Sequence, residues 1–190
     1  MAPEELLIKI SNILDALKIR YAVTGGYAVS VWGRPRYTAD IDIIVELEEK
    51  NIKPLAKELL NIAKDVYADE DMMRDALVHK GEFNFIEPEY GLKVDFFVQG
   101  NDSYAKLKFK RAVPRDNFGH RIFFVAPEDL ILSKLVWSRQ SMSFKQFEDI
   151  KTILKNDNIK LDMEYLEDWS QKQDTAEILA RLLDEIKNNK

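Results

Sequence analysis

Apolar positions alternate between helical and strand spacing along the first third of the chain. Residues 4–18 and 51–65 place apolar side chains three and four positions apart, which predicts two amphipathic helices. Shorter apolar runs at 20–24 and 39–47 predict strands, and the stretch 26–32 between them predicts a short helix. The amino-terminal part is therefore expected to mix helices and strands.

Further strands follow in the middle of the chain. The runs at 82–87 and 92–98 are joined by a Pro-Glu-Tyr-Gly segment, which predicts a hairpin-like connection. The segments 106–113 and 120–125 predict another strand pair around an Asn-Phe-Gly turn.

The remaining sequence predicts helices alone. Pro127 stands at the start of the first of them, and Ser143 with Gln146 predicts a capping box at the second. We therefore expect an α+β core over residues 1–125, with a small mixed or antiparallel sheet flanked by helices. A helical carboxyl-terminal region over 126–190 is expected to pack on it. The predicted helices of this region cover residues 127–139, 143–155, 162–171 and 174–187.

Composition narrows the classes of protein and site. The 190 residues include no cysteine, which excludes disulfides, thiolate metal sites and a cysteine nucleophile. With only His79 and His120 available, a zinc site of several histidines is not expected. No apolar run approaches the roughly 20 residues that cross a bilayer, and the first residues do not resemble a signal peptide. We expect a cytoplasmic protein with no membrane contact.

The charge distribution leaves two interpretations open. The net charge of −5 argues against a surface built for nonspecific nucleic-acid binding. One tract between residues 104 and 121 is nevertheless basic, and it is either a solvated strand pair with charged edges or a surface for an acceptor or phosphate group. Its basic residues are Lys106, Lys108, Lys110, Arg111, Arg115 and Arg121.

The most informative pattern is a glycine pair followed by aspartates on a strand. Gly25 and Gly26 end one apolar run, and Asp40 and Asp42 lie two positions apart in the next strand. Strand side chains alternate, so these two carboxylates face the same way, with Cα atoms about 6.5–7 Å apart. Carboxylates at that separation can coordinate divalent cations from one side, as nucleotidyl transfer requires. Asp95, on the strand predicted at 92–98, supplies a third carboxylate.

Together these parts resemble the nucleotidyltransferase superfamily related to DNA polymerase β. Its signature is a strand, a Gly-Gly or Gly-Ser turn, a helix, an Asp-x-Asp strand and a third carboxylate on a later strand. The finer resemblance is to the branch that contains AbiEii-type toxins, through Arg-x-Thr-x-Asp-x-Asp at 36–42. A later helix opens Pro-Glu-Asp-Leu and carries Lys134, and the next carries Asp149. The resemblance covers residues from about 21 to 154.

The resemblance implies an enzyme that uses Mg²⁺ or Mn²⁺, with two ions bound beside an NTP. Asp40 and Asp42 would bind both ions, whereas Asp95 would bind the catalytic ion and act as general base toward the acceptor hydroxyl. A further group of residues would bind the nucleotide. These are Thr24, Gly25, Gly26, Arg36, Lys134 and Asp149.

Simpler interpretations of these residues stay open. A glycine pair also suits an ordinary strand-to-helix turn, and Arg36 could form ion pairs with the aspartates that follow it. Lys134 could be solvated, or could pair with Asp149. Many members of the superfamily carry serine at the position of Gly26, where its hydroxyl touches a phosphate. In this chain Thr24 or backbone amides would have to make that contact.

We therefore predict a nucleotidyltransferase that moves an NMP from an NTP to a hydroxyl. For the AbiEii-like branch the resemblance implies an RNA acceptor, particularly a tRNA end, or a protein, together with an antitoxin partner in a toxin–antitoxin pair. Transfer to a small molecule, as in aminoglycoside nucleotidyltransferases, is the enzymatic alternative. Two alternatives without catalysis stay open. One is a catalytically idle relative that binds nucleotide or a protein partner, and the other is a scaffolding protein. Stabilisation by Mg²⁺ that Asp42→Ala abolishes would argue against both.

Overall fold

The chain forms two compact units. One comprises Met1–Tyr27 and Tyr37–Val125, and the other comprises Ala28–Arg36 and Ala126–Lys190. Residues 28–36 were predicted to belong to the core, whereas in the structure they group with the carboxyl-terminal helices. The computed structural model describes residues 1–38, 40–117, 119–141 and 143–188.

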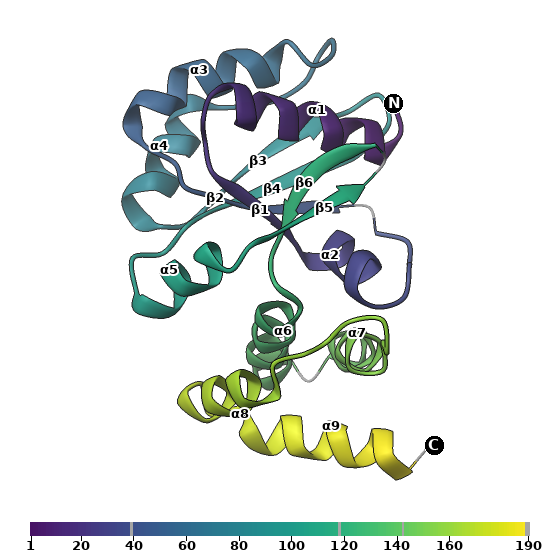
Figure 1. Cartoon of the computed structure of the whole chain (residues 1–190). Coiled ribbons are helices and arrows are strands. Elements are labelled where there is room, and N and C mark those ends of the chain that lie inside the picture. Colours follow the sequence, from purple (N-terminus) through teal and green to yellow (C-terminus); the bar gives the residue numbers. More distant parts are fainter. Residues whose placement is uncertain (39, 118, 142, 189–190) are drawn as a thin grey trace. The chain divides into compact units, whose positions relative to one another are not determined.

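The first unit is built on a mixed sheet of six strands within the described residues, in the order β3-β4-β2-β1-β6-β5 (Figure 1). Strand β2 runs parallel to β4 and antiparallel to β1, and β1 runs parallel to β6. Strands β3 and β4 form the predicted antiparallel pair, and β5 pairs with β6. The α+β class with a mixed sheet is thereby confirmed. The strands are β1 (Tyr21–Thr24), β2 (Asp40–Val45), β3 (Glu82–Glu87), β4 (Leu92–Val98), β5 (Val113–Asn117) and β6 (His120–Phe124).

Helices α1 and α3 lie along one face of this sheet, and α5 lies on the other (Figure 1). The core of the unit includes the strand residues Ile41, Ile43, Val94 and Phe96, all of them buried. Because side chains alternate along a strand, the polar residues between these positions point to the opposite face. This alternation directs the predicted aspartates away from the core. The helices of the unit are α1 (Pro3–Ala16), α3 (Glu49–Leu60), α4 (Glu70–His79) and α5 (Ser103–Lys110).

One predicted strand is a helix. The segment 106–113 was predicted to be extended, but α5 runs to Lys110, and β5 begins only at Val113. The alternation of lysines with apolar residues in this segment imitates the period of a strand. A helix forms because the Asp102 carboxylate accepts a hydrogen bond from the Ala105 N–H at 2.8 Å and caps its first turn. A strand pair is present, but it is formed by β5 and β6, and most of the predicted strand 106–113 is helical.

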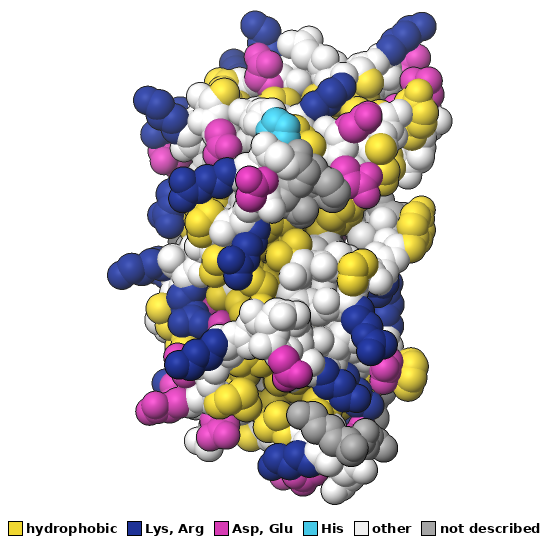
Figure 2. Space-filling view, turned by 45° about the vertical axis from the view of Figure 1, so that its right-hand side comes forward, with side chains coloured by type: hydrophobic (Ala, Val, Ile, Leu, Met, Phe, Trp, Pro, Cys, Tyr) yellow, Lys and Arg dark blue, Asp and Glu magenta, His cyan; other side chains and the backbone are white. Residues whose placement is uncertain are grey.

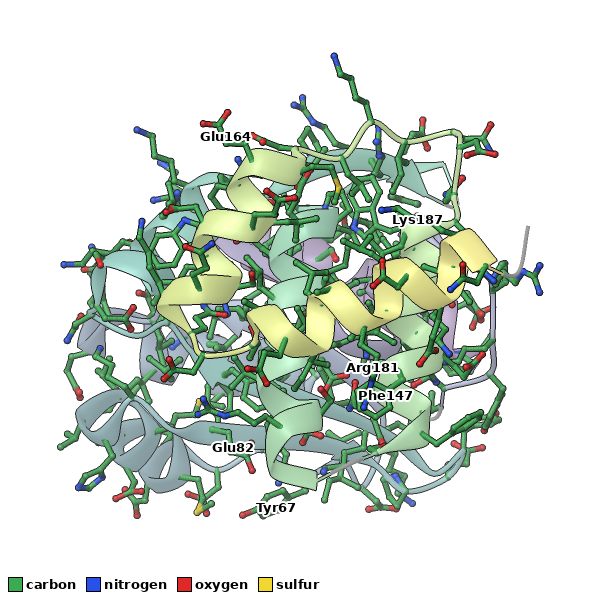
Figure 3. The ribbon with its side chains drawn as sticks, turned by 90° about the horizontal axis from the view of Figure 1, so that it is seen from below. Tyr67, Glu82, Phe147, Glu164, Arg181 and Lys187 are labelled. Carbon is green, nitrogen blue, oxygen red and sulfur yellow. The ribbon has the colours of Figure 1, made fainter. Side chains whose placement is uncertain are left out.

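The second unit is helical. Helix α2 (Gly25–Trp32) begins in the first unit and ends in the second. The segment 28–36 is joined to α7, since the Asn156 side chain after that helix donates to the Trp32 carbonyl oxygen at 2.8 Å. Arg181 of α9 lies over the Phe147 ring of α7, with its guanidinium carbon 5.3 Å from the ring centroid (Figure 3). Its other helices are α6 (Pro127–Ser141), α7 (Phe144–Leu154), α8 (Met163–Lys172) and α9 (Ala176–Asn188).

None of the helices in the described ranges combines the length and the hydrophobicity that a membrane span requires.

Candidate active site

The strand register places a row of polar residues across one face of the sheet. Thr24 of β1 lies opposite Asp42 of β2, and Asp42 lies opposite Asp95 of β4. Asn84 of β3 continues the row beside Asp95. Neighbouring strands are about 4.8 Å apart, so two carboxylates that the sequence offers in separate motifs lie side by side. In the adjacent row, Asp40 lies opposite Lys93.

Gly25 brings the backbone turn after β1 directly against the Asp42 side chain. Its φ of +59° is in the left-handed region, where glycine is favoured. A Cβ built on Gly25 would lie 1.8 Å from Oδ2 of Asp42, closer than any real contact. The glycine and the aspartate of the motif are therefore in contact, and a Cβ at position 25 would force the Asp42 side chain to move.

Gly26 faces Thr38 in the same way. A Cβ on Gly26 would lie 2.5 Å from Oγ1 and 2.7 Å from Cβ of Thr38. The Thr38 side chain thus fills the space that a serine at position 26 would need. Its hydroxyl donates to the carbonyl oxygen of Asp40 at 3.3 Å. The Thr38 hydroxyl therefore lies beside Gly26, a position for which the sequence predicted a phosphate contact from Thr24 or backbone amides instead.

Lys93 lies beside the aspartates but was not among the predicted site residues. Its Nζ lies 2.9 Å from Oδ1 of Asp95, with 43% of the lysine side chain and 15% of the aspartate side chain exposed. The hydrogen bond to Asp95 raises the pKa of Lys93, and the charges of Asp95 and Asp40 add to the rise despite partial burial. The signal was present in the sequence, because residues two apart on a strand share a face. Asn84, between the buried Phe83 and Phe85, carried a similar signal.

The donor chemistry of the three aspartates suits a divalent metal ion, since carboxylate oxygens are the ligands that Mg²⁺ prefers. The arrangement itself does not enclose an ion. Among the described residues, no three His, Cys, Asp or Glu side chains are grouped closely enough to hold one metal ion. The Asp95 carboxylate is instead hydrogen-bonded to the Lys93 ammonium.

Three predicted residues of the second unit form a single ion-pair cluster. Lys134 donates to Oδ2 of Asp149 at 2.7 Å, so of the alternatives left open for this lysine the structure shows the pairing with Asp149. Arg36 donates through Nε and Nη2 to both carboxylate oxygens of Asp149, at 2.8 and 2.9 Å. Lys134 and Asp149 are buried. The Lys134 ammonium also donates to the Gln146 side chain at 2.9 Å.

The capping box predicted at the start of α7 is wrong, because the Ser143 side chain makes no capping hydrogen bond.

Asp149→Asn is expected to lower the free energy of unfolding by about 3 kcal/mol at pH 7, because it leaves the buried Lys134 ammonium without its carboxylate. Burial alone raises the pKa of Asp149, but the hydrogen bonds from Arg36 and Lys134 and their charges outweigh burial and lower it. A carboxylate with a lowered pKa stabilises the fold above its ordinary value of about 4, and this stabilisation is lost as the pH falls through the folded pKa. Denaturant unfolding between pH 7 and pH 3 measures both effects.

Asp168→Asn is the matched control, because it removes an exposed lysine–aspartate pair, Lys172 to Asp168 at 2.6 Å. Such a pair contributes about 1 kcal/mol or less. Equal stabilities for Asp149→Asn and Asp168→Asn would contradict a stabilising role of the cluster.

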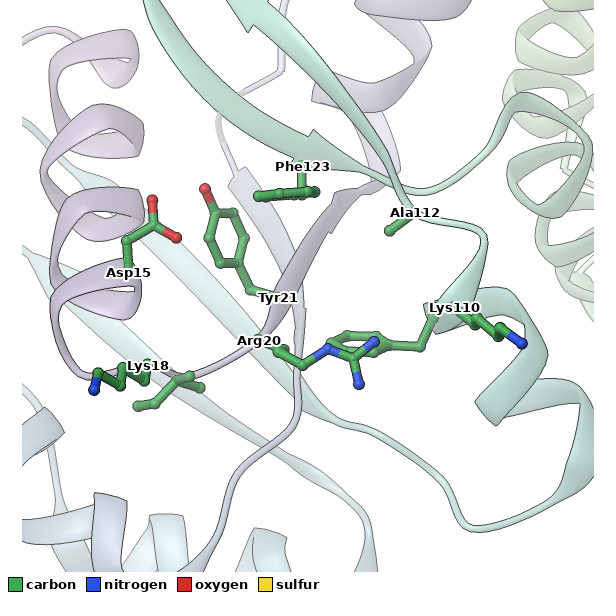
Figure 4. A pocket seen from close by; sticks show the side chains of 9 residues that line it. Asp15, Lys18, Arg20, Tyr21, Lys110, Ala112 and Phe123 are labelled. Carbon is green, nitrogen blue, oxygen red and sulfur yellow. The ribbon is translucent and has the colours of Figure 1, made fainter.

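A pocket of about 360 Å³ lies at the other end of β1 from Thr24 (Figure 4). The Tyr21 and Phe123 rings on its wall meet edge to face, with centroids 5.9 Å apart. Arg20 adds positive charge, and its guanidinium lies 5.0 Å from the centroid of the Phe109 ring. The residues that line this pocket include no residue predicted for the nucleotide or metal site. It is a separate feature of the first unit.

Comparison with known proteins identifies the fold. No family model and no curated protein matches the sequence. A nucleotidyltransferase-like protein from Paracoccidioides brasiliensis is 20% identical, with a TM-score of 0.52 over 80% of this chain and 73% of its own. The antibiotic-resistance factor ANT(2")-Ia, in complex with adenylyl-2"-tobramycin, is 14% identical, with a TM-score of 0.59 over 89% of this chain and 95% of its own. The lincosamide adenylyltransferase LnuA, bound to lincomycin, is 15% identical, with a TM-score of 0.56 over 80% and 96%. The chain therefore has the nucleotidyltransferase fold, as its glycine and aspartate pattern predicts.

Proposed function

We propose that this chain is a metal-dependent nucleotidyltransferase, which moves an NMP from an NTP to a hydroxyl acceptor. The observation that carries the proposal is the contact between the Gly25 turn and the Asp42 carboxylate, in a row where Asp42 lies beside Asp95. This arrangement combines a backbone turn at the start of a helix, which favours phosphate, with carboxylates that favour divalent cations. The fold supports the proposal, because the solved structures that share it include adenylyltransferases.

In the proposed reaction, the acceptor oxygen forms a bond to the α-phosphorus of the NTP. The bond from that phosphorus to the bridging oxygen breaks, and pyrophosphate leaves. The proton of the acceptor hydroxyl passes to the Asp95 carboxylate, which acts as general base once Lys93 releases it. Asp40, Asp42 and Asp95 would hold Mg²⁺ or Mn²⁺, whose charge neutralises the phosphate oxygens.

The remaining residues are proposed to bind the nucleotide. Around Thr24, Gly25 and Gly26, the amino end of α2 offers backbone N–H groups to phosphate oxygens. In the second unit, Lys134 and Arg36 share one carboxylate, that of Asp149. The three side chains therefore carry a formal charge of +1, which suits an anionic group. Arginine can also meet phosphate oxygens in a bidentate manner.

Two classes of acceptor are supported by different observations. The Arg-x-Thr-x-Asp-x-Asp motif supports an RNA acceptor, particularly a tRNA end, or a protein acceptor. It also supports an antitoxin as the binding partner of this chain. Transfer to a small molecule is supported by the fold neighbours bound to lincomycin and to adenylyl-2"-tobramycin. The net charge of −5 also suits a cationic acceptor better than RNA. On the face in Figure 2, acidic side chains are interspersed among the basic ones, which does not favour either class.

The test is label transfer from NTPs labelled at the α-phosphate, with Mg²⁺ and with tRNA, protein or an aminoglycoside as acceptor. We expect label to appear on one class of acceptor with one pyrophosphate released per transfer, and EDTA should stop both. The acceptor that takes the label decides between the two classes. Absence of transfer and of pyrophosphate release with every NTP and every acceptor would favour the idle relative.

A further inference from the structure

Four charged side chains on one face of the sheet form two pairs on neighbouring strands. Asp42 lies opposite Asp95, and Asp40 lies opposite Lys93 in the next row. All four are partly or fully exposed, while the residues between them are buried. The Lys93 ammonium lies 2.9 Å from Oδ1 of Asp95. Three carboxylates and one ammonium therefore share a small area of the sheet.

This ammonium and a divalent metal ion require the same oxygen atoms. Lysine donates its N–H groups to the carboxylate lone pairs, and Mg²⁺ or Mn²⁺ coordinates through those lone pairs. Since an ion held by these carboxylates would also lie within a few ångströms of a positive charge, the two cations repel each other. As long as Lys93 holds Asp95, its ammonium occupies one carboxylate oxygen of the ligand set.

We propose that Lys93 is a built-in competitor of the metal ion, which lowers the metal affinity of the carboxylates and couples metal binding to nucleotide binding. Lys93 offsets the repulsion among Asp40, Asp42 and Asp95 before the metal binds. It releases Asp95 when an NTP arrives, because its flexible four-carbon stem lets the ammonium move to the anionic phosphates. Lys93 is a positioning residue in this scheme, and it rests on the proposed nucleotidyltransferase function.

The test measures Mn²⁺ binding by calorimetry and by electron paramagnetic resonance, with and without a nonhydrolysable NTP. Without nucleotide, Lys93→Met is expected to bind Mn²⁺ about tenfold more tightly than the parent, because a positive charge about 5 Å from the ion has been removed. Lys93→Arg keeps the charge and should remain close to the parent. In the parent the NTP should strengthen Mn²⁺ binding more than it does in Lys93→Met.

Lys50→Met is the matched control, because it removes the same charge and a similar ion pair elsewhere in the first unit, Lys50 to Glu48 at 2.7 Å. It should bind Mn²⁺ as the parent does. The tighter binding of Lys93→Met should disappear when Asp42→Asn is added. Equal Mn²⁺ affinity of the parent and Lys93→Met would overturn the role of Lys93 and leave the metal site standing. Failure of both folded proteins to bind Mn²⁺, with or without NTP, would overturn the proposed function and the inference with it.

Discussion

Asp42→Asn is expected to lower the rate of nucleotidyl transfer about 1,000-fold and to leave the fold intact. The loss corresponds to about 4 kcal/mol of charge stabilisation in the transition state, a typical contribution of a metal ion at a phosphoryl centre. Asparagine has nearly the shape of aspartate, so the contact with Gly25 is retained and the negative charge alone is removed. Pyrophosphate release measures the rate, and circular dichroism with thermal unfolding confirms the fold.

Asp116→Asn provides the comparison for this loss. Asp116 lies on β5 of the same unit, opposite Arg121, and does not belong to the polar row of β1, β2 and β4. Its replacement removes the same charge from an exposed strand position and should leave the rate unchanged. If Asp42→Asn lost no more activity than Asp116→Asn, Asp42 would not be part of the catalytic site.

Gly25→Ala is expected to abolish metal-dependent nucleotide binding and to destabilise the protein by about 3 kcal/mol. Two effects add at this position. The φ of +59° is strained for any residue with a Cβ, and the new methyl group would meet the Asp42 carboxylate at 1.8 Å. The carboxylate must move, because the turn is backbone and cannot yield easily. Denaturant unfolding and nucleotide titration measure the two consequences.

Gly91→Ala separates strain from contact. Gly91 also has a positive φ, +65°, but a Cβ there would meet no atom within 4 Å. This variant should lose about 1 kcal/mol of stability, the cost of the left-handed conformation, and should bind nucleotide normally. If Gly91→Ala and Gly25→Ala were equally stable and bound nucleotide equally well, the contact between Gly25 and Asp42 would contribute to neither stability nor nucleotide binding.

Local patterns in the sequence were sufficient to predict much of the fold. The Asp40–Val45 strand and the hairpin of β3 and β4 follow from runs of apolar residues bounded by turn signals, and both are present. The prediction failed at α5, where alternating lysines imitated a strand and the cap at Asp102 favoured a helix. Alternating charged residues alone do not distinguish a strand from a helix when the residue before them can cap a helix.

The contacts of the site depend on pairings that the sequence does not encode locally. That Asp42 and Asp95 are neighbours follows from the register of two parallel strands, which a motif does not specify. The same register brings Lys93 beside Asp40, whereas the contact of Lys93 with Asp95 follows from their spacing of two residues on one strand. The bond from Arg36 to Asp149 joins segments far apart in the chain, and only the folded second unit reveals it.

The most direct test of the proposed nucleotide site is calorimetric titration with a nonhydrolysable NTP, with and without Mg²⁺, for the parent and for Asp42→Asn. We predict binding to the parent that requires Mg²⁺ and that is lost in the folded Asp42→Asn variant. Equal binding of the nucleotide by both proteins, or no binding by the folded parent with Mg²⁺, would contradict a carboxylate-held metal and nucleotide site on this sheet.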